Sequence, residues 1–288
     1  MTSDTQGSRS FSFELFPPKT PAGMEKLKAT VTDLRALGPE FLSVTYGAGG
    51  STQERTFATV DWLREEHIAT APHLSCIGAT RDEIGDILQR YRNQGITRLV
   101  ALRGDLPSGA GLSEPDELRY ANELVACLRA ETGDSFHIKV AAYPEYHPQA
   151  TSAQKDHENF RRKVAAGADS AITQYLYNAD AYFRFIDSCE SLGIGIPVVP
   201  GIMPITNYQQ LARFSDACGA EIPRWIRKRL EGFGEDLDSI RAFGRDVVTA
   251  LCRQLLDGGA HGLHFYTMNQ ASPTREIWQD LGIPAIVA

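Results

Sequence analysis

The chain has 288 residues, of which 42% are hydrophobic and 23% charged, and its formal net charge is −7. These values are typical of a soluble globular protein with one large α/β domain or two smaller ones. Acidic residues are spread along the chain and no basic block occurs, which argues against nucleic acid as a partner. No apolar run is long enough to cross a bilayer, so we expect no membrane association.

The N-terminus and the cysteines indicate the cellular compartment of the protein. Residues 1–9 are polar and lack the apolar core of a secretory signal, so we expect a disordered terminus. The five cysteines are scattered and form no CxxC pair, which favours a reducing compartment over disulfides or a zinc site. No HxH or HExxH spacing occurs either, so we predict a cytoplasmic protein without a metal site.

From residue 10 onward, strand-like and helix-like segments alternate. Short apolar runs that end at Gly, Pro or polar residues predict eight strands, at 11–16, 41–46, 72–77, 98–103, 138–143, 170–177, 196–200 and 263–267. Helical periodicity and capping residues predict helices at 24–37, from Ser51, from Thr80, at 117–130, 153–168 and 182–192, at least two within 207–260, and one at 274–281.

These repeats predict an α/β fold, a (β/α)8 TIM barrel that forms a single catalytic domain over residues 10–288. Most units repeat at about thirty residues, the size of a βαβ unit, and no linker divides them. An open Rossmann-like sheet is the alternative. It is disfavoured because no strand is followed by GxGxxG.

Polar residues stand at the ends of most predicted strands. The carboxyl ends of parallel barrel strands meet at one rim, where barrel enzymes carry their active sites. Any one of these residues could be ordinary turn chemistry, but the set indicates an active site: Glu14, Thr45, Tyr46, His73, Arg103, Asp105, Tyr143, Glu145, Gln174, Tyr266 and Thr267.

Glu14 is the strongest candidate for an acid. It lies between Phe-Ser-Phe and Leu-Phe, and a carboxyl held among aromatic side chains loses hydration, which raises its pKa. Pairing with an arginine is the alternative for Glu14. Asp105 and Arg103 could form a local ion pair, or Arg103 could hold an anionic cofactor. For His73 the alternative is a packing role, because a single histidine in a strand is more often a packing residue than a catalyst.

The predicted helix at 153–168 carries a polar face. Asp156, Asn159, Arg162 and Lys163 are three or four residues apart and therefore lie on one side of the helix. Such a face could bind the ribose and diphosphate of a dinucleotide. A solvated face with internal ion pairs is the alternative.

Six runs of the sequence resemble methylenetetrahydrofolate reductases, in particular the bacterial catalytic-barrel form: 13–18, 43–48, 71–74, 101–105, 141–145 and 264–267. The resemblance implies a flavin-dependent enzyme that reduces 5,10-methylenetetrahydrofolate to 5-methyltetrahydrofolate. NADH or NADPH would supply the hydride in a ping-pong reaction through FAD, feeding methionine synthesis. The family also suggests a homodimer or homotetramer.

The resemblance implies roles for individual residues. Glu14 would be the general acid that protonates N10 of the folate, and Asp105 would stabilise the cation that develops. Gln174 would hold the pterin, while Gln210 and Phe214 would cover the shared nicotinamide and folate site. Positions that would bind FAD are Thr45, Ala48, His73, Arg103, Gly104, Asp105, Tyr120, Ala121, Tyr143, His147, Asp156, Asn159, Arg162 and Lys163.

One position departs from the family pattern. Gln270 stands where family members often carry arginine. Glutamine offers only a neutral hydrogen bond to the carboxylate tail of folate, so affinity for that tail is the property expected to change. Two other functions compete with the reductase: a folate-using barrel methyltransferase without flavin, and a non-catalytic binding barrel, which would have no use for acids at both Glu14 and Asp105.

Overall fold

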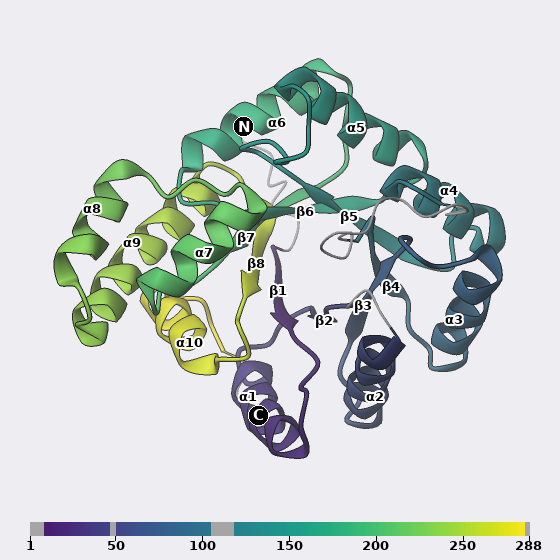
Figure 1. Cartoon of the computed structure of the whole chain (residues 1–288), viewed down its shortest axis with the longest axis horizontal. Helices are drawn as coiled ribbons and strands as arrows, with labels where there is room; N and C mark the ends of the chain where they lie inside the picture. The colour runs from purple at the N-terminus through teal and green to yellow at the C-terminus, as the bar shows by residue number, and fades with distance from the viewer. Residues whose placement is uncertain (1–8, 47–49, 105–117, 286–288) are drawn as a thin grey trace, which may run out of the picture.

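The computed structural model describes residues 9–46, 50–104 and 118–285. Eight parallel strands close into a barrel in chain order, and the last strand pairs with the first (Figure 1). The strands are β1 (Ser10–Leu15), β2 (Phe41–Val44), β3 (Thr70–Ser75), β4 (Arg98–Leu102), β5 (His137–Ala142), β6 (Ser170–Tyr175), β7 (Val198–Ile202) and β8 (Gly262–Tyr266). The predicted (β/α)8 TIM barrel is confirmed.

Helices surround the barrel and follow its strands along the chain (Figure 1). They are α1 (Pro21–Arg35), α2 (Gly50–Glu65), α3 (Arg81–Asn93), α4 (Ala121–Thr132), α5 (Ala153–Ala165), α6 (Ala179–Ser191), α7 (Tyr208–Cys218), α8 (Arg224–Phe233), α9 (Leu237–Asp257) and α10 (Ala271–Asp280). The stretch after β7, predicted to hold at least two helices, holds α7, α8 and α9.

Local capping signals located some helix ends and missed others. Thr80 and Glu83 form the predicted capping box of α3, and the Asn178 side chain caps α6 by accepting from the Asp180 N–H. By contrast, α2 begins at Gly50, so Ser51 lies inside the helix, and α4 begins at Ala121 rather than at residue 117.

Strand β7 lies two residues later than predicted. The prediction started at Ile196 and stopped at Pro200, whereas the strand continues through Gly201 to Ile202. Gly201 lies inside the strand and does not end it. Glycine is needed here because neighbouring groups approach its Cα atom closely. A Cβ at this position would collide with the Thr173 carbonyl oxygen and the Tyr266 ring.

Alternation along each strand separates the inside of the barrel from its outer layer. In β1, Phe13 and Leu15 belong to the main hydrophobic cluster between strands and helices, where Phe13 packs edge-on against Trp278 of α10. Ser12 and Glu14 therefore point to the opposite face, into the barrel. The same alternation directs polar side chains of β3, β5 and β8 inward.

Asn269 joins the first and last strands at the rim. Its side-chain amide donates to the Phe16 carbonyl and accepts from the Phe16 N–H, both at 2.8 Å, as a neighbouring strand would. Its φ of 54° lies in the left-handed region, which asparagine tolerates better than most residues. The side chain thus extends the β1–β8 pairing beyond the last strand residue.

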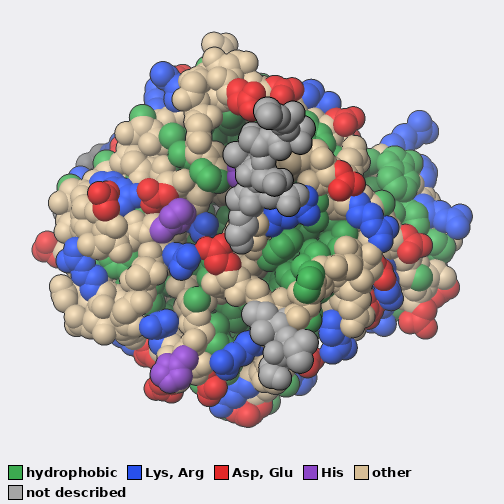
Figure 2. Space-filling model, turned by 180° about the vertical axis from the view of Figure 1, so that it is seen from behind, with side chains coloured by type: hydrophobic (Ala, Val, Ile, Leu, Met, Phe, Trp, Pro, Cys, Tyr) green, Lys and Arg blue, Asp and Glu red, His purple; other side chains and the backbone are tan. Residues whose placement is uncertain are grey.

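The surface carries interspersed charges of both signs, and hydrophobic side chains gather at the edge where α8 lies (Figure 2). Trp225 of α8, 61% exposed, is the most exposed large hydrophobic side chain among the described residues. Of the helices described, none is long and apolar enough to span a membrane.

Replacing Asn269 by alanine should lower the free energy of unfolding by about 2–3 kcal/mol. The change leaves two part-buried backbone groups of Phe16 without partners and places alanine in a left-handed conformation. Urea denaturation measures the effect. Asn93→Ala, which removes only a surface contact with Gln89, is the control and should change stability by less than about 0.5 kcal/mol; equal losses would contradict the role of Asn269.

Candidate active site

Glu14 occupies the penultimate position of β1 and is 6% exposed. Its Oε2 lies 3.5 Å from Nε2 of His73 on β3 and 3.8 Å from Nε2 of His264 on β8. Within the described part of the chain, its ion-pair contacts are with these two histidines and not with an arginine. The alternative left open by the sequence, a Glu–Arg pair, is therefore absent from the described residues.

Burial favours the neutral form of all three groups. It raises the pKa of Glu14, while the charge of His73 acts in the opposite direction and is the smaller cause. Burial lowers the pKa of His73 to about 4, and burial together with the Lys139 cation lowers the pKa of His264 to about 3. Near neutral pH the carboxyl therefore faces two uncharged imidazoles and holds its proton more tightly than an exposed glutamate.

The raised pKa of Glu14 has a different structural origin from the one the sequence suggested. Its neighbours Phe13 and Leu15 face the outer layer and do not surround the carboxyl. The groups that do approach it come from distant strands: His73, His264 and Tyr266, whose pKa is itself raised by burial first and by Glu14 second. The barrel interior, and not the aromatic sequence context, removes water from Glu14.

Four predicted cofactor residues belong to one network of contacts. Gln149, which the sequence analysis did not identify, links the first of them, Arg103, to the other three. Arg103 follows β4, and its guanidinium donates to Gln149 Oε1 at 2.5 Å. The Gln149 N–H donates to Nδ1 of His147 at 3.1 Å, and the His147 N–H donates to Asp156 on α5 at 3.1 Å. The T-shaped contact of the His147 ring with Tyr143, at 4.6 Å between centroids, completes the group.

Lys163 lies beside this network. Its Nζ donates to the Ala141 carbonyl at 2.5 Å and stands 5.9 Å from the centre of the Tyr143 ring. Burial lowers the pKa of Lys163 to about 8, and the Asp156 charge partly opposes that shift. The chain thus holds a cation of reduced proton affinity near the rim.

The other predicted cofactor residues are more scattered. Arg162 is exposed and pairs with Glu158, Asn159 is half-buried on α5, and Tyr120 is exposed just before Ala121, where α4 begins. Thr45 follows β2 and accepts through its carbonyl from the Thr56 hydroxyl. Ala48 and Asp105 lie outside the described residues.

Gly104 follows Arg103 with a φ of 88°, a conformation that favours glycine. A Cβ at this position would collide with the Ser75 hydroxyl. The Ser75 hydroxyl itself donates to the Arg103 carbonyl at 2.8 Å. This turn therefore brings the backbone after β4 close against the end of β3.

The predicted substrate residues come from three parts of the rim. Gln174 is half-buried in β6, and its side-chain oxygen accepts from the Tyr175 N–H. Gln210 and Phe214 are one helical turn apart on α7, where Phe214 is 39% exposed. Gln270 is the exposed N-cap residue of α10, directly after Asn269.

A small cavity of about 10 Å³ lies among Tyr143, Glu145, Gln174, Tyr175 and Cys218, with five further lining residues. Glu145 accepts from the Glu221 N–H at 2.8 Å and so ties the loop after β5 to the segment between α7 and α8. Burial raises the pKa of Glu145 to about 7. Three predicted site residues, Tyr143, Glu145 and Gln174, therefore line the same small cavity.

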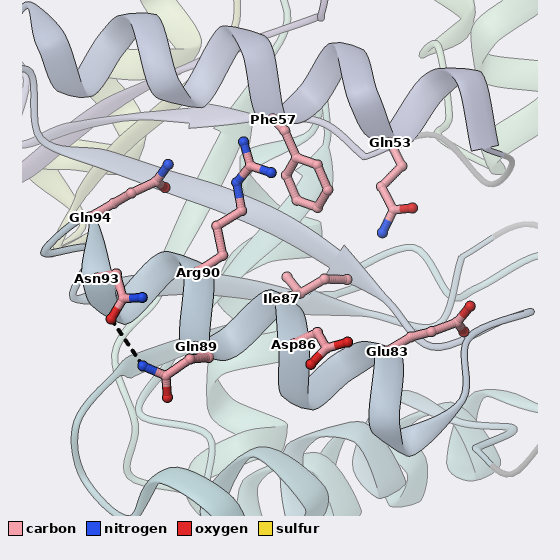
Figure 3. A pocket seen from close by; sticks show the side chains of 9 residues that line it. All are labelled: Gln53, Phe57, Glu83, Asp86, Ile87, Gln89, Arg90, Asn93 and Gln94. Atoms are coloured by element: carbon pink, nitrogen blue, oxygen red, sulfur yellow. Dashed lines mark hydrogen bonds between the residues drawn. The ribbon is translucent and has the colours of Figure 1, made fainter.

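A larger groove of about 760 Å³ lies between α2 and α3, away from the predicted site residues (Figure 3). The Arg90 guanidinium covers the Phe57 ring there at 4.3 Å and pairs with Asp61. None of the predicted site residues lines the groove. Among the residues described, no group of three or more His, Cys, Asp or Glu side chains is placed to hold a metal ion, and the expectation of a metal-free site stays a prediction.

A closed (β/α)8 barrel with a buried carboxyl at the carboxyl end of a strand is the architecture of the TIM-barrel enzymes. A sequence model of the family described as methylenetetrahydrofolate reductase matches residues 1–282. The chain belongs to the methylenetetrahydrofolate reductase family.

Relatives with this name cover nearly the whole chain. The 5,10-methylenetetrahydrofolate reductase of Salmonella typhimurium is 42% identical over 281 residues, covering 97% of this chain and 93% of the relative. That of Escherichia coli is 41% identical over the same shares. The methylenetetrahydrofolate reductase (NADH) 1 of Arabidopsis thaliana is 36% identical over 96% of this chain but only 49% of its own length.

A solved structure supports the fold alone. It is an uncharacterized protein from Clostridium thermocellum that binds two copies of 5-methyl-5,6,7,8-tetrahydrofolic acid. Its TM-score with this chain is 0.68 at 16% identity, and the match covers 96% of each chain.

The raised pKa of Glu14 can be measured directly. In infrared difference spectra between the wild type and Glu14→Gln, the carbonyl stretch of a protonated carboxylic acid should persist above pH 4.5, the ordinary value for this group. The reason is that burial disfavours the carboxylate. A carboxylate band already complete at pH 4.5 would contradict this assignment. Glu25→Gln, a change at an exposed glutamate, is the control.

Proposed function

We propose that this chain reduces 5,10-methylenetetrahydrofolate to 5-methyltetrahydrofolate, with bound FAD as the hydride carrier and NADH or NADPH as the donor. The reaction is ping-pong, and its product feeds methionine synthesis in the cytoplasm. The observation that carries the proposal is the buried Glu14 carboxyl, placed between two uncharged histidines at the rim of a barrel of this family. Assembly as a homodimer or homotetramer belongs to the same proposal.

The residues at the rim fit a flavin dinucleotide. Its diphosphate is anionic, and Arg103 and Lys163 supply cations beside the network of Gln149, His147 and Asp156. The glycine turn at Gly104 lets the backbone pack closely against β3, leaving no side chain at that point of the rim. Bound FAD would accept hydride from the nicotinamide and pass it to the folate.

The chain's own residues would supply the proton and the position of the folate. Glu14, whose pKa burial raises, donates its proton to N10, which opens the five-membered ring and leaves a cation that accepts the hydride. Asp105 is proposed to stabilise this cation by its charge. Gln174 holds the pterin, Gln210 and Phe214 cover it, and Gln270 offers a neutral contact to the folate tail.

An anaerobic spectroscopic titration tests the function. The purified protein should be yellow, bleach with NADH or NADPH and regain its colour with methylenetetrahydrofolate. Glu14→Gln should bleach at the wild-type rate yet fail to regain its colour, because only the folate half-reaction needs the proton. A protein that stays colourless with added FAD would refute the flavin assignment and favour the flavin-independent methyltransferase. Loss of both half-reactions in Glu14→Gln would refute the role of Glu14.

FAD binding should weaken as the pH rises through about 8, the pKa to which burial lowers Lys163. The protonated amine attracts the diphosphate, so the dissociation constant should rise by roughly tenfold per pH unit above that pKa. Fluorescence titration of the apoprotein measures it. Lys163→Met should bind FAD weakly and without this pH dependence. Lys155→Met, at a lysine of the same helix that pairs with Glu158, should retain it; a flat wild-type profile would contradict the prediction.

A further inference from the structure

Behind Glu14 lies a second buried contact that the proposed reaction does not yet use. Ser12, two residues earlier on β1, lies opposite His264 in the β1–β8 register, and its Oγ is 2.7 Å from Nδ1 of His264. Ser12 is 1% exposed and His264 0%. The other ring nitrogen of His264, Nε2, faces Oε2 of Glu14 and has no hydrogen-bond partner among the residues that the structure describes.

This contact decides which nitrogen of the neutral ring carries the proton. A neutral imidazole has one N–H and one bare nitrogen, and the partner of one nitrogen fixes the state of the other. In the part of the chain that the structure describes, His264 is the only hydrogen-bond partner of the Ser12 hydroxyl. If Ser12 accepted from Nδ1, its own buried proton would lack an acceptor, which is costly.

We propose that Ser12 and His264 are positioning residues for the acid. The Ser12 hydroxyl donates to Nδ1 of His264, which places the ring proton on Nε2 and directs that N–H at Oε2 of Glu14. This inference rests on the proposed function, in which Glu14 gives its proton to the folate. No proton passes to or from His264: the proton of Glu14 goes to N10, and the carboxylate left behind accepts a hydrogen bond from Nε2–H.

The surroundings of His264 explain why a neutral donor suits this position. The Lys139 ammonium, which donates to Ser170 Oγ at 3.1 Å, opposes protonation of the ring, and Phe41 stacks on it with centroids 6.3 Å apart. Tyr266 meets the ring edge-on at 5.3 Å. A neutral N–H can stabilise the new carboxylate without forming a permanent ion pair, which would hold Glu14 ionised before the reaction.

His73 is nearer to Glu14 but lacks this support. Its Nε2 lies 3.5 Å from the carboxyl, and it is also one of the predicted FAD positions. Over residues 9–46, 50–104 and 118–285, neither ring nitrogen of His73 has a hydrogen bond with a serine. The distance of 3.8 Å at His264 is longer than a hydrogen bond. Contacts of this kind are often long in the free enzyme and shorten when substrate binds.

Nitrogen NMR of the holoprotein tests the tautomer without any turnover. In protein labelled with ¹⁵N-histidine, the signals of His264 are identified by their loss in His264→Gln. We expect Nε2 protonated and Nδ1 bare in the wild type, and a mixture of tautomers in Ser12→Ala. Ser43→Ala is the matched control: Ser43 is a fully buried serine on β2, directly opposite Glu14 in the β1–β2 register, and its hydroxyl has no hydrogen-bond partner within the described residues.

Rapid-reaction kinetics tests the consequence. Ser12→Ala should slow the folate half-reaction roughly fivefold, the effect of one hydrogen bond, and leave flavin reduction by NADH unchanged. Its loss of rate at high pH should begin at a higher pH than in the wild type, because Glu14 without the donor is a weaker acid. Ser43→Ala should match the wild type in both rates and in the pH profile.

Three outcomes would overturn the inference: a wild-type ring protonated at Nδ1, a Ser12→Ala profile equal to that of Ser43→Ala, or equal slowing of both half-reactions. The proposed function fails differently. If Glu14→Gln still reduces the folate, Glu14 is not the acid, whatever tautomer His264 adopts. If the tautomer is wrong while Glu14→Gln remains inactive with folate, only the Ser12–His264 role is lost.

Discussion

Closure of the barrel between β1 and β8 is the constraint on which the site depends. The first strand pairs along five residues with the last, and the side chains that meet across this seam are about 250 positions apart in the chain. Thr267 donates to the Glu14 carbonyl at 2.6 Å, and Asn269 continues the pairing at Phe16. The backbone on both sides of the acid is therefore held by the end of the chain.

Closure of the barrel buries polar groups of β1, β3 and β8 inside it, and their pKa values shift accordingly. Glu14 becomes harder to ionise, while His73 and His264 become harder to protonate. All three shifts favour neutral forms, so the site avoids a buried ion pair, whose desolvation is expensive. An arginine beside Glu14 would have had the opposite effect and held the carboxyl ionised. The identity of its neighbours thus decides whether this residue can act as an acid.

The repeating architecture could be predicted because its signals are local. Strand length, helix periodicity and the Thr80–Glu83 capping box depend only on residues close together in the sequence. They predicted the eight units that the barrel contains. Predicted strand boundaries were wrong where a contact with residues far away in the sequence determines them. Strand β7 passes through Pro200 and Gly201 because Gly201 must fit against Thr173 and Tyr266, which no local rule shows.

The candidate site could be predicted only in part, because some of its contacts join residues that are far apart in the sequence. Glu14 could be identified by its position at a strand end, but the residues that shift its pKa lie on β3 and β8, and strand alternation turns the neighbouring Phe13 away from it. His264 stands in the middle of an apolar strand, where a histidine is easily taken for packing. Only its register opposite Ser12 shows that it has a directed contact.

The rim network around α5 shows a second limit. The helix face with Asp156 and Lys163 follows from a spacing of seven residues, but Gln149 and His147 lie on irregular backbone with no period. Tyr146 has a φ of 71°, and this left-handed residue turns the chain so that His147 meets both Tyr143 and Asp156. Such a turn is uncommon for a tyrosine. Helices and strands therefore position the site residues that could be predicted from periodicity. Strained loop residues such as Tyr146 bring the remaining site residues, which have no period, into contact with them.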